Sequence, residues 1–152
     1  MSLTVTLTGP RSVEKPKAQL DHLFGEYLRP FAMPDAHFYV GGAVGIDTMS
    51  LDWLAEHSRS VLTVVVPCTV ADQPATAAAA IRRWNDAGRI ADVVELRAGR
   101  LGTDAYHARN RWMVDRSGMV IGFPQAEVRS GGTWYTIDYA ADQGKPRLIV
   151  PV

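Results

Sequence analysis

Two kinds of hydrophobic pattern alternate along the chain. Short apolar or β-branched runs predict strands, and "VLTVVVP", apolar almost throughout, predicts a strand covered on both faces. Between these runs apolar residues recur at helical spacing, as Leu20, Phe24 and Tyr27 do. The predicted strands are 3–9, 37–42, 61–67, 92–96, 118–123 and 147–151, and the predicted helices lie between Pro16 and Pro30 and at 46–57, 74–88, 105–117 and 133–143.

This alternation predicts a single α/β domain over residues 1–152. The connections are short, which favours a Rossmann-like, three-layer fold with a mainly parallel sheet of about six strands and helices on both faces. We expect Thr103 or Asp104 to cap the helix that follows them.

Composition narrows the class of protein. Apolar residues make up 47% and charged residues 21%, which is typical of a folded globular chain. Lys plus Arg equals Asp plus Glu at 16 each, so no global basic field favours duplex nucleic acid, although a local basic site remains open. The lone Cys68 excludes an internal disulfide and fits a reducing compartment. Because no apolar run approaches the ~20 residues of a membrane span and no secretory pattern is present, we expect a cytoplasmic protein.

Two glycine-rich turns suggest a ligand site. "GGAVGID" at 41–47 and "RSGGT" at 129–133 each lead from a predicted strand towards a helix start. In a parallel sheet such turns gather beyond the carboxyl ends of the strands, where helix N-termini favour an anion. The loops 8–12 and 66–69 should meet them there, and "HARNR" at 107–111 adds arginines. We therefore expect both turns to face one phosphate-bearing, nucleotide-like ligand.

Simpler interpretations stay open for several of these residues. Neither turn matches the dinucleotide or P-loop motif, so the glycines could serve only as tight turns. Asp47 could satisfy N–H groups in the first turn of its helix, and Ser130 and Thr133 could cap theirs. Arg11 and Arg109 are favoured for phosphate contact. Arg111 is expected in solvent and Cys68 in the core, and no metal is expected because the four histidines, His22, His37, His57 and His107, share no ligand spacing.

The segments "TGPRS", "GGAVGID", "ARNRWMVDRSGMVIGFP" and "SGGTWYTIDYA", in this order, resemble the SLOG superfamily. It includes the Rossmann-like domain of DprA, the YpsA-like proteins and the Lonely Guy phosphoribohydrolases, and the similarity is greatest to stand-alone YpsA-related proteins. The resemblance covers residues 4 to about 150. It implies a sheet that binds a nucleotide or nucleotide derivative, often in a homodimer.

The resemblance also implies site residues. The ligand- or phosphate-binding positions expected from the turns and the resemblance are Gly9, Arg11, Ser12, Gly41, Gly42, Gly45, Asp47, Arg109, Asn110, Ser130, Gly131, Gly132 and Thr133. Lonely Guy enzymes carry a catalytic glutamate three residues after the threonine of the last turn, and here that position is Thr136. A hydroxyl cannot replace that carboxylate in glycosidic cleavage, which argues against this activity. We therefore expect a nucleotide sensor or carrier. A nucleotide-processing hydrolase or transferase and a single-stranded nucleic-acid-binding protein remain the alternatives.

Overall fold

The computed structural model describes residues 2–152, and every predicted strand and helix is present. The strands are β1 (Thr4–Thr8), β2 (His37–Gly41), β3 (Val61–Val66), β4 (Asp92–Glu95), β5 (Met119–Gly122) and β6 (Arg147–Ile149). The helices are α1 (Lys17–Tyr27), α2 (Ile46–His57), α3 (Ala75–Asp86), α4 (Thr103–Asp115) and α5 (Gly132–Asp142), with short 3-10 helices at Arg29–Phe31 and Val70–Asp72.

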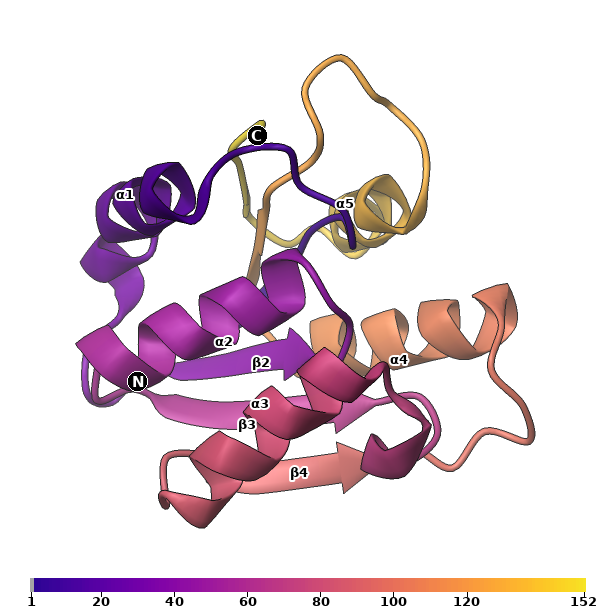
Figure 1. Ribbon diagram of the computed structural model, residues 1–152. Coiled ribbons are helices and arrows are strands. Elements are labelled where there is room, and N and C mark those ends of the chain that lie inside the picture. The colour runs from indigo at the N-terminus through magenta and orange to yellow at the C-terminus, as the bar shows by residue number, and fades with distance from the viewer. Residues whose placement is uncertain (1) are drawn as a thin grey trace.

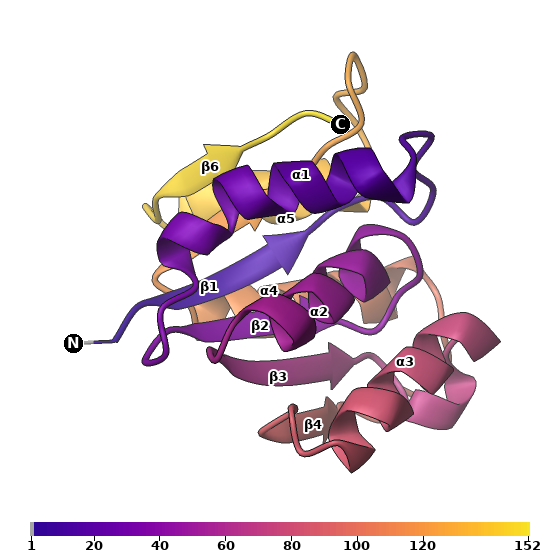
Figure 2. The same cartoon turned by 60° about the vertical axis from the view of Figure 1, so that its left-hand side comes forward.

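The strands form one six-stranded sheet in the order β4-β3-β2-β1-β5-β6, and every pairing is parallel. Helices α1, α2 and α3 cover one face of the sheet, and α4 and α5 cover the other (Figures 1 and 2). The predicted α/β, three-layer fold is therefore confirmed. The chain winds outwards from β1 to β4 and then returns to β5 on the other side of β1, so the strand order reverses between β1 and β5.

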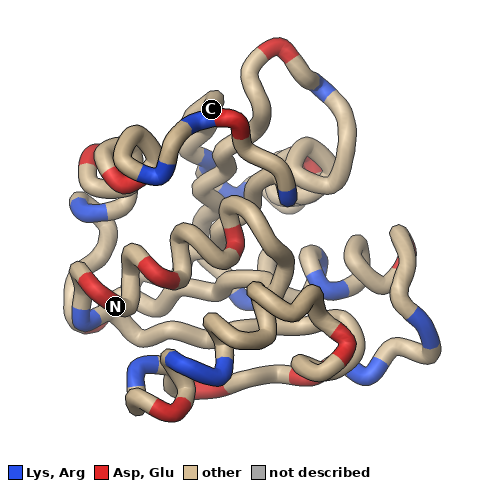
Figure 3. The backbone as a smooth tube through the Cα atoms, viewed as in Figure 1, with Lys and Arg blue, Asp and Glu red and all other residues tan. Residues whose placement is uncertain are grey.

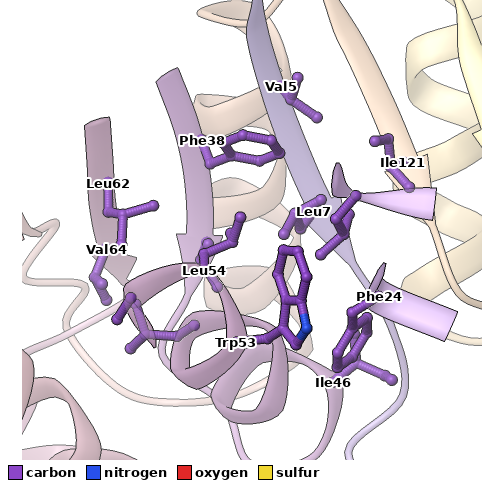
Figure 4. Packing of buried hydrophobic residues seen from close by; sticks show 14 of the residues in the cluster. Val5, Leu7, Phe24, Phe38, Ile46, Trp53, Leu54, Leu62, Val64 and Ile121 are labelled. Carbon is purple, nitrogen blue, oxygen red and sulfur yellow. The ribbon is translucent and has the colours of Figure 1, made fainter. Parts of the chain in front are cut away.

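The main core lies between the sheet and the α1–α3 layer. Val5, Phe38 and Leu62 reach it from the strands, and Leu54 and Trp53 reach it from α2 (Figure 4). The predicted burial of β3 on both faces is confirmed from Leu62 to Val66, whereas Val61 at its start is 37% exposed. Cys68 is buried, and its thiol donates to the carbonyl of Ala98 over 3.5 Å.

The starts of α4 and α5 correct two expectations. Their cap residues are Gly102 and Gly131, and no side chain described in the structure makes a capping hydrogen bond at either position. Thr103 and Asp104 already lie inside α4, and Thr133 lies inside α5, so none of them occupies the cap. Glycine bends the backbone into each helix without a side-chain partner; Gly131 does so at φ 92°. The hydroxyl of Thr133 is consequently left for another role.

Within residues 2–152 the structure contains no helix that is both long and apolar enough to cross a membrane.

Candidate functional site

A cavity of about 400 Å³ opens at the carboxyl edge of the sheet, where the strand order reverses. We call it the edge cavity. Its size falls within the range of small-molecule sites, and its position is the one that ligands favour in open parallel sheets. It is lined by Leu7, Thr8, Gly9, Pro10, Arg11, Ala43, Asp47, Thr103, Tyr106, His107, Arg109, Asn110, Gly132 and Thr133.

A buried acid and a buried base share one wall of the edge cavity. Arg109 is only 5% exposed, and its guanidinium donates to Asn110 Oδ1 over 2.7 Å and to the carbonyl of Val65 over 3.3 Å. Asp47 is 6% exposed and accepts the N–H of Ala43 over 3.2 Å. Asp47 therefore satisfies a backbone N–H, as one of its two interpretations proposed, and lines the cavity as well.

Burial dominates the electrostatics of these two groups. It raises the pKa of Asp47, an effect that the positive charge of Arg109 opposes. It lowers the pKa of Arg109, and here the negative charge of Asp47 opposes the effect. Each charge thus offsets part of the cost of burying the other.

Gly41 provides the room for this pair. A Cβ atom at this position would lie 2.5 Å from Arg109 Nη1 and 2.6 Å from Asp47 Oδ2, so a side chain there would have to displace both charged groups. The glycine thus allows two charged protein groups to approach its backbone.

Two further buried polar side chains have hydrogen-bonding capacity to spare. Thr133 is 8% exposed and Asn110 is 7% exposed. Among residues 2–152 neither the Thr133 hydroxyl nor the Asn110 amide nitrogen has a hydrogen-bond partner. Across the same residues no buried side-chain nitrogen or oxygen is both sealed from solvent and unpaired. Because both residues line the edge cavity, these two groups open into it.

Arg11 and Tyr106 line the cavity from two different segments of the chain. Arg11 follows β1 in the chain and Tyr106 belongs to α4, and the Arg11 guanidinium carbon lies 4.1 Å from the centre of the Tyr106 ring. Next to Tyr106, His107 stacks on Tyr135 of α5 with ring centres 3.6 Å apart. Arg111 donates to the Tyr135 hydroxyl over 2.6 Å, so its side chain is bound to α5 instead of extending freely into solvent.

Seven of the predicted site residues line the edge cavity together: Gly9, Arg11, Asp47, Arg109, Asn110, Gly132 and Thr133. Others lie apart from it. Ser12 lines a separate hollow of about 180 Å³, and Ser130 and Gly131 line one of about 130 Å³ that shares Pro10, Gly132 and Thr133 with the edge cavity.

Several predicted glycines contact protein atoms closely. A Cβ atom on Gly9 would lie 2.4 Å from Ile46, one on Gly42 would lie 2.4 Å from Val66, and one on Gly45 would lie 2.5 Å from the carbonyl oxygens of Pro10 and Arg11. In contrast, a Cβ atom on Gly131 or Gly132 would have no neighbour within 4 Å among the described residues. The glycines of the loop after β1 and of the turn at 41–47 therefore let parts of the protein pack closely, whereas the turn before α5 has open space in front of it.

Sequence reasoning missed Tyr106 and His107. A signal was present, because Tyr106 precedes Arg109 by three residues and Asn110 by four, which places it on the same face of a helix. Among residues 2–152 no three side chains of the metal-ligating types gather at one point.

No protein-family model and no curated protein matches the sequence. Solved structures do. DNA processing protein A (DprA) from Streptococcus pneumoniae superposes with a TM-score of 0.72 at 20% identity, over 99% of this chain and 51% of that one. DprA from Helicobacter pylori, whose structure concerns its single-stranded DNA binding mode, gives 0.70 at 19% identity over 99% and 66%.

The Moco carrier protein from Chlamydomonas reinhardtii gives a TM-score of 0.60 at 13% identity, over 100% of this chain and 78% of that protein. The fold of this chain is therefore similar to that of DprA and of the Moco carrier protein. The resemblance predicted from the motifs is thus confirmed at the level of the fold. The chain spans about half the length of one DprA structure and about two thirds of the other.

Proposed function

We propose that the edge cavity binds a nucleotide or nucleotide derivative through its phosphate, and that the chain acts as a cytoplasmic sensor or carrier. The observation that carries this proposal is the pair of buried groups with free hydrogen-bonding capacity, the Thr133 hydroxyl and the Asn110 amide, in a cavity that also holds two arginines. Both groups open into the cavity, and neither the hydroxyl nor the amide nitrogen is bonded to another described protein atom, so both are available to a polar ligand.

A phosphate is the ligand group that fits this set of donors. The N-terminus of α5 has no side-chain cap, and its first-turn N–H groups are suited to an anion. The exposed side chain of Arg11 can supply paired hydrogen bonds to phosphate oxygens. Asp47 can accept a hydrogen bond from a hydroxyl of the ligand, such as one on a sugar.

Thr136 supports binding over glycosidic cleavage. It is fully buried, and its hydroxyl donates to the carbonyl of Gly132 over 2.9 Å. The position where Lonely Guy enzymes carry their glutamate is therefore occupied by a side chain bonded within its own helix. We accordingly propose no bond-breaking step.

The proposal is tested by two variants of Gly132. Asparagine and aspartate have nearly the same size and fit the open space at this position, but aspartate adds a negative charge in front of α5. By calorimetry with inorganic phosphate and the four ribonucleoside 5′-monophosphates, we expect Gly132→Asp to weaken binding by at least about tenfold relative to Gly132→Asn. Equal affinities in the two folded variants would remove the anion site from this turn. Native mass spectrometry of the freshly purified protein would show which ligand co-purifies.

Single-stranded nucleic acid is the second candidate ligand, favoured by the DprA structure described for its DNA-binding mode. In the view of Figure 3 basic and acidic residues are interspersed, and the net charge is zero, which supports a short ligand. A nucleic-acid-binding protein should bind oligonucleotides more tightly as they lengthen, with strong salt dependence. Full competition by a mononucleotide at low concentration would count against it.

We also propose a homodimer or higher homo-oligomer, as the SLOG resemblance implies. Analytical ultracentrifugation that finds only monomer across the micromolar range would refute this part.

A further inference from the structure

The ring of Tyr106 is the feature of the edge cavity that phosphate binding leaves unexplained. It is half-buried, lines the cavity and has the Arg11 guanidinium 4.1 Å above its centre. The stack joins the loop after β1 to helix α4, so it bridges two sides of the cavity.

The backbone of Arg11 is fixed, whereas its side chain is not. The carbonyl of Pro10 accepts the N–H of Ile46 over 3.1 Å, and Gly45 lies tightly against the carbonyl of Arg11. The Arg11 side chain itself is exposed, and among residues 2–152 no carboxylate lies within ion-pair distance of it. A rotation of this side chain alone would uncover the ring.

An anion in the edge cavity would compete with the ring for Arg11. Paired, charge-assisted hydrogen bonds to a phosphate are stronger than an exposed contact between a guanidinium and an aromatic ring. A phosphate held at the start of α5 therefore draws Arg11 away from Tyr106. The freed face of Tyr106 is then a flat apolar surface next to the bound phosphate.

We propose that Tyr106 stacks on the base of the bound nucleotide, and that Arg11 covers its ring until the phosphate draws the guanidinium away. This inference rests on the proposed function, because it needs an anion in the cavity. It makes Tyr106 the residue that selects a nucleotide over bare phosphate. It also explains how a nucleoside without phosphate is disfavoured, since such a ligand must displace Arg11 without offering it a new partner.

The test compares wild-type protein with Tyr106→Leu, which fills the space without an aromatic face, and Tyr106→Phe, which keeps the ring. The probes are inorganic phosphate and the four ribonucleoside 5′-monophosphates, measured separately by calorimetry. We expect Tyr106→Leu to weaken binding of the preferred monophosphate by roughly 5- to 100-fold, the range found when stacking on a base is lost. The same variant should bind inorganic phosphate about two- to fivefold more tightly, because Arg11 no longer has to leave the ring. Tyr106→Phe should keep both wild-type affinities.

Arg11→Ala provides an independent measurement, since it alters an exposed side chain and leaves the core intact. It should weaken phosphate binding but tighten binding of the corresponding nucleoside by about two- to fivefold, because the ring is now open. If wild-type protein binds phosphate and a monophosphate, but Tyr106→Leu moves both affinities in the same direction or moves neither, the stacking role is refuted and the proposed function stands. If wild-type protein binds none of the probes, the proposed function itself fails.

Discussion

At the scale of single residues, the loop that carries Arg11 is held against the start of α2 by contacts that need a glycine. Gly45 has φ 79°, and a Cβ atom there would lie 2.5 Å from the carbonyl oxygens of Pro10 and Arg11. Ile46, the next residue, donates its N–H to the Pro10 carbonyl. Gly45 thus helps to fix the position of the Arg11 backbone beside the edge cavity.

A pair of glycine variants separates backbone strain from this close contact. Gly88 has almost the same φ, 75°, but a Cβ atom there would have no neighbour within 4 Å in the described chain. We expect Gly88→Ala to lower the free energy of unfolding by about 1–2 kcal/mol, the cost of the left-handed backbone. Gly45→Ala should lower it by about 1–3 kcal/mol more, because the methyl group meets rigid backbone. Urea denaturation measures both losses, and equal losses would show that the loop yields to the methyl group.

The limits of sequence reasoning are also clearest at this scale. Thr133 was predicted as a site residue because its turn leads into a helix at the ligand-binding edge of the sheet, and Arg109 because it lies on a neighbouring helix. Asn110 was expected only from the SLOG resemblance. Which atoms approach each glycine is set by the tertiary structure, so the contact of Gly41 with Arg109 and Asp47 could not be foreseen.

At the scale of elements, helices α4 and α5 cover the second face of the sheet and contact each other beside the edge cavity. His107 stacks on Tyr135, and Arg111 donates to the Tyr135 hydroxyl over 2.6 Å. Nearer the other end of the helices, the Tyr139 hydroxyl donates to Asp115 over 2.6 Å. Because α5 begins at Gly132, Tyr135 lies about one turn from its N-terminus and Tyr139 about two turns from it.

This arrangement predicts that Tyr135 affects ligand binding from outside the edge cavity. Tyr135→Leu removes the stack and the hydrogen bond, which loosens the start of α5. We expect phosphate affinity to fall by about three- to tenfold, as the site loses preorganisation. Tyr139→Phe is the matched control, since it removes one hydrogen bond farther from the turn, and its affinity should stay at the wild-type level. Calorimetry with inorganic phosphate makes the comparison, and similar losses in both variants would contradict a local role for Tyr135.

Elements were the most predictable level of this molecule, because the spacing of apolar residues is a local property. The apolar run of β3 and the helix at 46–57 were both placed correctly from sequence. The order of strands was not contained in those patterns. The adjacency of β1 and β5, which creates the reversal where the edge cavity lies, follows from how the whole chain winds.

At the scale of the whole molecule, the partly buried His37 predicts that the free energy of unfolding falls in mild acid. His37 begins β2, stacks on Tyr39 with ring centres 4.4 Å apart and shares a 2.7 Å hydrogen bond between its Nε2 atom and Thr63 Oγ1. Burial lowers the pKa of His37 below its ordinary value of 6.5, and the negative charge of Asp92 only partly opposes this effect. The folded protein therefore favours the neutral imidazole.

The sign of the resulting pH dependence follows from proton linkage. A base whose pKa is lower in the folded state binds more protons when unfolded, so stability rises with pH across the interval between the two pKa values. The contribution of His37 is present above about pH 6.5 and is lost as the pH falls through that value towards the pKa of the folded state. The variant His37→Gln can keep the bond to Thr63. We expect its free energy of unfolding to fall less steeply between pH 7 and 5 than that of the wild type, by at most the slope that the uptake of about one proton produces. Urea denaturation across this pH range measures the free energy of unfolding of both proteins. Identical slopes for wild type and His37→Gln would contradict the prediction, because the charged imidazole would then be no less stable in the folded sheet than in water.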